Sequence, residues 1–224
     1  MNGWTENDSQ VYRDIADVAV PLRQELIATL VAAVPFAAAE PVKILELGSG
    51  DGRLAEALLT VFSRATLTAL DGSESMRGET AARLALFGDR ARVAAFDLTA
   101  LDWWDRMFGV DVIVSSLCLH HLNDAKKQYL YKAAAERLSA RGALLVADLI
   151  DPQHPALHRL AADQWDARRR RRPIGWDPRS CFSASSTPGG TISVFPTRPS
   201  SRRRCFISWS GCGMRAFQRS IAAG

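Results

Sequence analysis

One carboxylate and three glycines stand close together in the first quarter of the chain. Glu46 interrupts an otherwise apolar run, and Gly48, Gly50 and Gly52 follow it at every second position. Burying a carboxylate costs on the order of several kcal/mol unless a cation or hydrogen-bond donors meet it. Glycines in a turn let the backbone approach a ligand closely, because no Cβ intrudes. The segment therefore favours a ligand that carries an ammonium and a sulfonium over one that presents a pyrophosphate.

Two further acids end the next two apolar runs. Asp71 lies 25 residues after Glu46, and a carboxylate at that place can accept hydrogen bonds from both hydroxyls of a ribose. Asp97 follows the third run, where it is suited to accept a hydrogen bond from an adenine amino group. Each acid is also a good turn former, so a purely structural role is the alternative at both positions. Together with Glu46, the two acids would suit a ligand in which a nucleoside is joined to a positively charged tail.

His120 and His121 are the candidate general bases. They follow the run that ends at Ser115, and imidazole titrates near neutrality, so either ring could take a proton from an acceptor that holds one. The alternative is a structural role in front of a helix capped by Asn123 or Asp124. Because the two histidines are adjacent and no second pair of ligands stands at a useful spacing, we expect no metal site.

The elements that must position these residues follow from the periodicity. Strands are expected over residues 42–47, 65–70, 92–96, 110–115 and 142–150. Helices are expected over residues 9–33, with a break or kink at Pro21, and over residues 53–63, 73–87 and 123–138. Short strands separated by amphipathic helices predict an α/β fold with a doubly wound, mostly parallel sheet covered on both faces. Ligands of such sheets bind beyond the carboxyl ends of the strands, where the residues described above lie.

These segments together resemble a class I S-adenosylmethionine-dependent methyltransferase of the small-molecule type. The residues that carry the resemblance are Glu46-Leu47-Gly48-Ser49-Gly50-Asp51-Gly52, Asp71, Asp97-Leu98 and Ser115-Ser116-Leu117, within residues 40–150. The resemblance implies a Rossmann-like methyltransferase fold of seven strands, of which the last two form an antiparallel hairpin. It also implies S-adenosyl-L-methionine as the cofactor. The implied reaction is an in-line transfer of methyl to an oxygen, nitrogen or carbon nucleophile of a small molecule.

The resemblance assigns roles to individual residues. Glu46 and the loop Gly48–Gly52 are implied to hold the methionyl end, and Asp71 the ribose. Asp97 and the Leu98 backbone are implied to hold the adenine. The cofactor-binding residues that follow are Glu46, Gly48, Ser49, Gly50, Gly52, Asp71, Gly72, Met76, Asp97, Leu98, Ser115 and Tyr12.

The acceptor side of the site is implied in the same way. Ser115 and its neighbour Ser116 would lie near the sulfonium. A segment around Trp4 and Tyr12 resembles the helix that closes over cofactor and substrate in small-molecule members of the family. Of the two catalytic candidates, His121 and His120, the resemblance favours His121, because many relatives have a histidine at that position of a Leu-His-His-Leu run.

Two other functions remain open from the sequence. The run Gly50-Asp51-Gly52-Arg53-Leu54-Ala55 fits the loose dinucleotide pattern, which would suit an NAD(P)-type oxidoreductase. Glu46 and the lack of a second mononucleotide half argue against that function. The third function is that of a truncated or inactive module that only binds the cofactor, which the unusual C-terminal sequence suggests.

The charge of the chain is divided unevenly. Residues 1–167 hold 16 of the 28 basic and 23 of the 24 acidic residues, whereas residues 168–224 hold 12 arginines, one acid and no leucine. We expect an N-terminal helical cap over residues 1–38, an S-adenosylmethionine-binding domain over residues 39–167 and a basic, low-order tail over residues 168–224. The last two strands of the sheet would then be missing or aberrant, although residues 191–195 and 205–209 could form the hairpin.

Three accounts of this tail compete. Its arginine clusters and aromatic residues would suit an arm that contacts RNA phosphates and stacks on bases. It could equally be a disordered extension. The abrupt loss of Leu, Glu and Lys after residue 167 favours a third account, translation out of frame. We expect a small-molecule acceptor as the partner, and only this tail leaves nucleic acid open.

The composition also indicates the cellular compartment in which we expect the protein. No run of about eighteen apolar residues occurs and the N-terminal residues are polar, so neither a membrane span nor a secretory signal is expected. Four cysteines dispersed over 224 residues do not form a disulfide framework. We therefore expect a reducing, cytoplasmic location.

Overall fold

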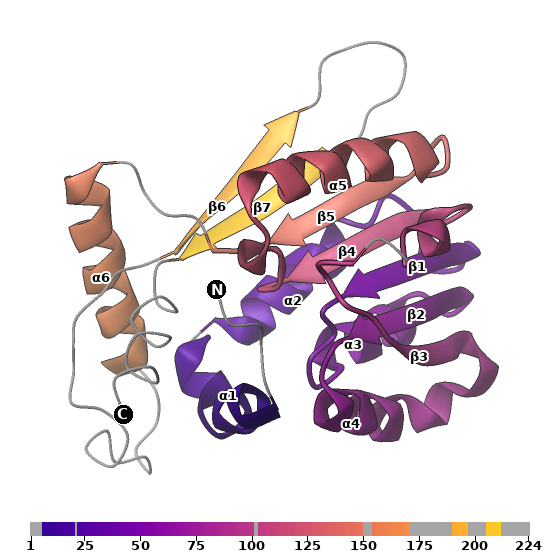
Figure 1. Cartoon of the computed structure of the whole chain (residues 1–224), viewed down its shortest axis with the longest axis horizontal. Coiled ribbons are helices and arrows are strands. Elements are labelled where there is room, and N and C mark those ends of the chain that lie inside the picture. The colour runs from indigo at the N-terminus through magenta and orange to yellow at the C-terminus, as the bar shows by residue number, and fades with distance from the viewer. Residues whose placement is uncertain are drawn as a thin grey trace.

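The computed structural model describes residues 6–20, 22–100, 103–149, 154–170, 190–196 and 205–211 (Figure 1). Its helices are α1 (Glu6–Ala19), α2 (Arg23–Ala32), α3 (Arg53–Val61), α4 (Glu74–Leu84), α5 (Asp124–Arg137) and α6 (Pro155–Arg170). Its strands are β1 (Val42–Leu47), β2 (Ala65–Asp71), β3 (Ala91–Ala95), β4 (Val112–Ser116), β5 (Ala143–Ala147), β6 (Gly190–Pro196) and β7 (Cys205–Gly211). The short 3-10 helices η1 (Ala85–Arg90), η2 (Trp104–Met107) and η3 (Leu119–His121) lie between them.

Five parallel strands form the central sheet, in the order β3-β2-β1-β4-β5. The chain runs outward from β1 to β3 on one side and then continues at β4 on the other side of β1, so the strand order reverses between β1 and β4. The register places Glu46 between Ala69 of β2 and Val114 of β4. The predicted doubly wound parallel sheet is confirmed. The carboxyl ends of β1 and β4 are the place where such a fold binds its ligand.

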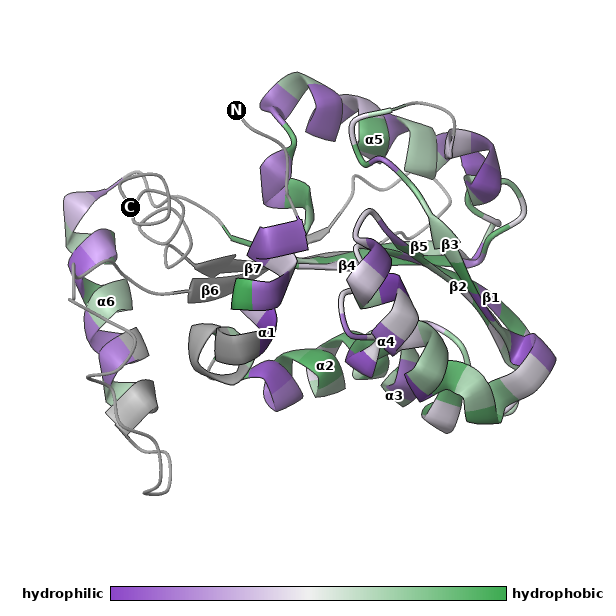
Figure 2. Cartoon of the chain, turned by 60° about the horizontal axis from the view of Figure 1, so that its bottom comes forward, coloured by the Kyte–Doolittle hydropathy of each residue, from purple (hydrophilic) through white to green (hydrophobic). Residues whose placement is uncertain are grey.

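Both faces of the sheet are covered, because successive residues of each strand point to opposite sides. Ile44 and Val112 pack with α2 and α3 on one face, whereas Leu45 and Ile113 pack with α5 on the other. Figure 2 shows the sheet nearly edge-on between these helix layers. This two-sided burial explains why β1 is an almost continuous apolar run, in which Glu46 is the buried acid. None of the helices in the described ranges has the length and apolar character needed to cross a membrane.

The first predicted helix is in fact two helices. α1 ends at Ala19 and α2 begins at Arg23, on either side of the predicted break at Pro21. A proline lacks the amide hydrogen that an interior helical turn requires. α2 packs on the sheet, whereas α1 lies against α4, where Arg13 pairs with Glu79 at 2.6 Å. The N-terminal segment therefore lies over the carboxyl-end side of the domain.

The last two strands form a hairpin beside the main sheet that is not hydrogen-bonded into it. β6 and β7 pair antiparallel, with Gly190 opposite Gly211 and Pro196 opposite Cys205. In the described part of the chain β7 lies alongside β5, but the two-stranded sheet is separate from the five-stranded one (Figure 1). The strands expected to be missing or aberrant are thus present as the hairpin that the resemblance implies, detached from the ladder. The remaining residues after Arg170 lie outside the described ranges, so the accounts of the tail stay predictions.

Candidate active site

The turn after β1 requires its glycines. Gly48, Gly50 and Gly52 have φ angles of 71°, 55° and 79°, in the left-handed region that strains a residue with a side chain. A Cβ on Gly48 would lie 2.4 Å from Sγ of Cys118, and one on Gly52 would lie 3.0 Å from Thr80. The three glycines and the residues between them therefore form a tight backbone loop, called here the cradle (residues 48–52), packed directly against the segment that follows β4.

Glu46 lies beneath the cradle and is 1% exposed. Its Oε2 atom is buried and has no hydrogen-bond partner within the described residues. Burial raises the pKa of Glu46 well above its ordinary value. The negative charges of Asp71 and Asp51 raise that pKa further, and Arg23 opposes them. A cation bound beside this carboxylate would offset both its desolvation and the repulsion from its neighbours.

The other acid of the cradle, Asp51, is already paired. Its Oδ1 lies 2.5 Å from Nη2 of Arg23, and its Oδ2 lies 2.9 Å from Nε of Arg53. Ser49 adds a buried hydroxyl that has no partner among the described residues. Of Glu46 and Asp51, Glu46 is therefore the one that keeps an oxygen without a partner among the described residues.

Asp71 ends β2 and ties the cradle to that strand. Its Oδ2 accepts the N–H of Gly50 at 2.7 Å, and its Oδ1 accepts the N–H of Ser73 at 2.9 Å. Burial raises the pKa of Asp71, although both hydrogen bonds oppose this shift. Each oxygen keeps a further lone pair, so the carboxylate can still accept ribose hydroxyls. Gly72 follows directly, and Met76 is buried in the first turn of α4, so these predicted residues all lie at one corner.

Asp97 follows β3 and is exposed. Its Oδ1 accepts the N–H and the hydroxyl of Thr99 at 2.7 and 2.8 Å, and these hydrogen bonds lower the pKa of Asp97. Leu98 packs against the core on the α5 side of the sheet. The structure thus gives Asp97 the turn-forming role that was the alternative, while its exposed carboxylate remains accessible to an adenine amino group.

The segment after β4 bends sharply over the cradle. The buried hydroxyl of Ser115 donates to the carbonyl of Leu47 at 3.0 Å, so this side chain ties β4 to β1. Ser116 is the last residue of β4. Leu117 follows with a φ of 54°, which is strained for a leucine, and its N–H donates to the carbonyl of Ala147 at 2.8 Å. The bend brings the following residues against Gly48, at the end of the cradle implied for the methionyl group.

α1 covers another side of the site. Tyr12 of α1 and Met76 of α4 line a cavity of about 190 Å³ that also reaches Asp51 in the cradle. Trp4, the other aromatic residue of the predicted closing segment, lies outside the described residues. Tyr12 and Asp51 of the cradle therefore line one cavity.

The start of α1 is attached to the start of α4 through Glu6. Its carboxylate accepts hydrogen bonds from the Ser73 hydroxyl at 2.9 Å, the Glu74 N–H at 2.6 Å and the Ser75 hydroxyl at 2.7 Å. These bonds, that of Ser75 first, lower the pKa of Glu6 to about 2. Sequence reasoning missed this contact, because an acid in a polar N-terminal segment gives no sign of its distant partner.

The two candidate histidines are held differently. Nδ1 of His120 lies 2.7 Å from Oδ1 of Asp148, and the two imidazole rings lie 4.1 Å apart. Burial lowers the pKa of His121 to about 4, and the neighbouring His120 contributes to the shift. Asp148 was not predicted, because the sequence predicts a single strand over residues 142–150. β5 ends at Ala147, so Asp148 lies at the carboxyl end of a strand, as Asp71 and Asp97 do, and that shared position is the signal that could have found it.

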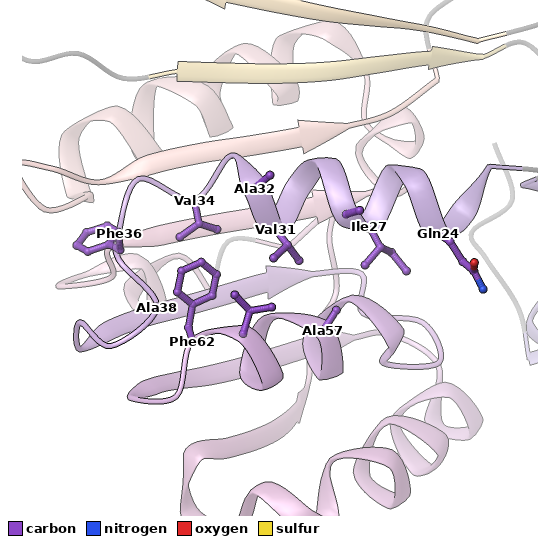
Figure 3. Close-up of a pocket in the computed structure, with 11 residues that line it drawn as sticks. Gln24, Ile27, Val31, Ala32, Val34, Phe36, Ala38, Ala57 and Phe62 are labelled. Carbon is purple, nitrogen blue, oxygen red and sulfur yellow. The ribbon is translucent and has the colours of Figure 1, made fainter.

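An apolar groove between two helices is separate from this site. It has a volume of about 560 Å³ and lies between α2 and α3, lined by residues such as Ile27, Val31 and Phe62 (Figure 3). None of the residues at the strand ends lines it. The candidate active site is therefore the polar region around the cradle rather than the larger hollow.

Comparison with known proteins identifies relatives of this domain. Residues 45–144 match the protein family described as a methyltransferase domain. A curated relative, an uncharacterized methyltransferase of Bacillus licheniformis, is 32% identical over 108 residues, which cover 48% of this chain and 47% of the relative. The chain thus spans about half the length of the curated relative that it matches.

Two solved structures are among those that match this chain. A putative S-adenosyl-L-methionine-dependent methyltransferase from Methanococcus maripaludis is 16% identical with a TM-score of 0.51, over 75% of this chain and 71% of that one. An S-adenosylmethionine-dependent methyltransferase from Thiobacillus denitrificans, solved with S-adenosyl-L-homocysteine, is 20% identical with a TM-score of 0.43, over 57% of this chain and 52% of that one. The first of these supports the fold described above.

The residues present fit the implied cofactor. Glu46 offers a buried carboxylate with an unpaired oxygen to an ammonium or sulfonium, and Ser49 offers an unpaired hydroxyl. The left-handed glycines leave the backbone open to close approach, and Asp71 retains acceptor capacity for a ribose. A pyrophosphate would add negative charge beside the carboxylate of Glu46, which the cradle cannot offset.

Proposed function

We propose that this chain, in which residues 45–144 form a class I S-adenosylmethionine-dependent methyltransferase domain, transfers a methyl group to a small-molecule acceptor. S-adenosyl-L-methionine is the cofactor of the domain. When bound, it supplies a methyl group activated by attachment to a positively charged sulfur. The acceptor, the methylated atom and the activity of the whole chain are the parts of this proposal that need experiment.

The observation that carries the proposal is the buried carboxylate of Glu46. Its unpaired oxygen lies among other acids and beneath a glycine loop whose backbone is open to a ligand. Glu46 and the cradle would hold the methionyl end, Asp71 the ribose, and Asp97 with Leu98 the adenine. By holding the methionyl end, the ribose and the adenine of the cofactor, the chain would place the methyl group beside the segment that bears His120 and His121. Positioning and exclusion of water supply most of the acceleration when the donor is already reactive.

The cover formed by α1 supports an acceptor of small size. Glu6 and Arg13 attach this helix across α4, and Tyr12 brings it to the cradle. An acceptor must reach the methyl group beneath that cover, which suits a metabolite better than a folded macromolecule. A cytoplasmic location, with no membrane partner, belongs to the same proposal and rests on the dispersed cysteines of the sequence.

Calorimetry tests the proposal at its first step. Purified protein should bind S-adenosylmethionine and its demethylated product and should not bind NAD. Binding of NAD instead would support the oxidoreductase that the pattern of residues 50–55 left open. Binding of neither would leave the chain without its cofactor and overturn the proposal.

The acceptor is found by a second experiment. Methyl transfer from isotopically labelled S-adenosylmethionine into a metabolite extract should label a small molecule. Transfer into RNA, with steeply salt-sensitive binding that depends on residues 168–224, would contradict the small-molecule class. Tight cofactor binding without any transfer would instead support the alternative of an inactive cofactor-binding module.

A further inference from the structure

Asp148 contacts both the side chain and the backbone of His120. Oδ1 of Asp148 lies 2.7 Å from Nδ1 of His120, and Oδ2 accepts the backbone N–H of His120 at 2.9 Å. Oδ1 also accepts the N–H of Leu149 at 2.7 Å. Asp148 is only 6% exposed, so little water competes for these bonds. A carboxylate fixed by two backbone donors gives the imidazole ring a single orientation.

The same contact determines which ring nitrogen carries the proton. An ionised carboxylate can only accept hydrogen bonds, so the proton of His120 lies on Nδ1. Nε2 is then left with a lone pair. That atom is buried and has no hydrogen-bond partner in the described part of the chain. The ring therefore keeps one acceptor nitrogen that no described group satisfies.

The segment that bears His120 packs on the cradle. η3 follows β4 and Asp148 follows β5, and these two strands are neighbours, with Ser116 opposite Ala147. Cys118, two residues before His120, lies so close to Gly48 that a Cβ there would meet its sulfur at 2.4 Å. The segment that bears His120 is thus anchored, through Cys118, at the end of the cradle that would hold the methionyl group.

We propose that His120 is the general base of this domain, that Asp148 is its positioning residue, and that the acceptor carries a hydroxyl group of phenolic acidity. The inference rests on the proposed methyl transfer. A base is needed where the acceptor atom must lose a proton to become a good nucleophile. A phenolic hydroxyl is acidic enough to pass its proton to an imidazole during the transfer, whereas an alcohol that is as weakly acidic as water is not.

The transfer balances as a single displacement. The hydroxyl proton of the acceptor passes to Nε2 of His120 while the acceptor oxygen forms a bond to the methyl carbon. The bond between that carbon and sulfur breaks, and its electron pair remains on sulfur. The products are an aryl methyl ether, S-adenosylhomocysteine and a protonated His120, which the negative charge of Asp148 stabilises until the proton leaves to water.

The other titratable groups near the pair are less suited to this role. Burial and His120 lower the pKa of His121 to about 4, although Asp148 and Asp8 of α1 oppose the shift, so His121 has little affinity for a proton at neutral pH. Burial raises the pKa of Tyr131 on α5, which keeps that hydroxyl neutral. Burial likewise raises the pKa of Cys118. Of these groups, His120 is the one that has a carboxylate partner, Asp148, and also a ring nitrogen without a hydrogen-bond partner in the described part of the chain.

The tautomer of His120 can be measured without any acceptor. In protein labelled with ¹⁵N in histidine, long-range proton–nitrogen spectra show which ring nitrogen carries hydrogen. The chain has four histidines, and the spectrum of His120→Gln assigns the resonances of His120 by their loss. We expect His120 protonated on Nδ1 in the wild type and a mixture of tautomers in Asp148→Asn. A wild-type His120 protonated on Nε2 would overturn the proposal.

Single-turnover transfer to two phenols supplies the second readout. 4-Methylphenol resembles a tyrosine side chain, whereas 4-nitrophenol is largely ionised at mildly alkaline pH and needs no base. His120→Gln should slow transfer to 4-methylphenol by about 10²–10⁴-fold and transfer to 4-nitrophenol by less than about tenfold. Asp148→Asn should lower kcat for 4-methylphenol with little change in KM. The matched control is His154→Gln, an exposed histidine before α6, which should keep both rates.

Three outcomes would contradict the proposal. Equal slowing with both phenols would show a structural role for His120, and equal rates in variant and wild type would show no role. A wild type that transfers methyl to neither phenol would overturn the acceptor class. Calorimetry keeps these outcomes separate from the proposed function: a wild type that does not bind S-adenosylmethionine contradicts methyl transfer itself, whereas binding that persists in both variants leaves only the role of the pair in question.

Discussion

The backbone N–H of Gly50 donates a hydrogen bond to Oδ2 of Asp71 over 2.7 Å, and this contact joins the cradle after β1 to the end of β2. The second oxygen of Asp71 accepts the N–H of Ser73 at 2.9 Å. This one carboxylate therefore binds both the cradle and Ser73, the residue that precedes α4. The resemblance implies that a ribose would bind at the same carboxylate. Its replacement should disturb the loop and the ligand together.

Asp71→Asn tests that double role. An amide has only one acceptor oxygen, so its NH₂ group must face the N–H of either Gly50 or Ser73. We expect the free energy of unfolding to fall by about 1–3 kcal/mol, measured by urea unfolding. The affinity for S-adenosylmethionine, measured by calorimetry, should fall at least about tenfold. The exposed Asp89→Asn is the control, and an Asp71 variant with wild-type affinity would remove Asp71 from the cofactor site.

Gly48→Ala tests the packing of the cradle against the segment after β4. The added Cβ would lie 2.4 Å from the Cys118 sulfur, at a φ of 71° that alanine adopts poorly. We expect a loss of about 1–3 kcal/mol in the free energy of unfolding, together with weaker cofactor binding. Gly78→Ala, in the open middle of α4, should instead stabilise the protein by about 0.5–1 kcal/mol. Equal effects of the two substitutions would mean that the cradle is looser than described.

Glu6→Gln tests the attachment of α1. The pKa of Glu6 is lowered from 4.5 to about 2 by its bonds to residues 73–75, so the attachment is present above about pH 4.5 and is lost as the pH falls toward 2. The variant lacks this contribution at neutral pH. Hydrogen exchange of α1 amides should therefore be faster in the variant than in the wild type at neutral pH, and similar in both near pH 2. Glu25→Gln on α2 should leave α1 unchanged, and protected α1 amides in the Glu6 variant would contradict the attachment.

His121→Gln tests the burial of the second histidine. The pKa of His121 is lowered from 6.5 to about 4, so the unfolded chain binds a proton between these values that the folded protein does not. The wild type must then lose stability as the pH falls from about 6.5 to about 4. Urea unfolding near pH 7 and near pH 5 should show a smaller loss in the variant. The same loss in both proteins would mean that His121 is solvated in the folded state.

Much of the fold could be predicted because each element has a local cause. Val42–Leu47 was predicted to the residue, since a strand buried on both faces is one apolar run and Gly48 ends it. A helix was predicted to start at Ser73, and the Ser73 side chain caps α4 by accepting the N–H of Met76 at 3.2 Å. Such signals depend on neighbours in the sequence, so they can be recognised without knowledge of the tertiary structure.

The parts that could not be predicted depend on distant contacts. The hydroxyl of Ser115 donates to the carbonyl of Leu47, a contact that only the pairing of β4 with β1 decides. Asp148 was concealed inside an apolar run, and its partner His120 lies 28 residues earlier. Residues whose roles depend on distant partners are the ones that sequence reasoning misses.

Glu46→Gln removes the buried charge while keeping the shape of the side chain. Because the pKa of Glu46 is raised in the folded protein, its ionisation opposes folding, and stability is lost as the pH rises through that pKa. The cofactor-free variant should therefore be at least as stable as the wild type at neutral pH. A thermal unfolding midpoint at or above that of the wild type shows that the variant is folded.

The most direct measurement is calorimetric titration of S-adenosylmethionine into wild type and into Glu46→Gln, with the exposed Glu25→Gln as the matched control. If the methyl donor's positive charge is what Glu46 accommodates, the affinity of the Glu46 variant falls on the order of tenfold or more while the control binds as the wild type does. A folded Glu46 variant that binds the donor as tightly as the wild type would contradict the account.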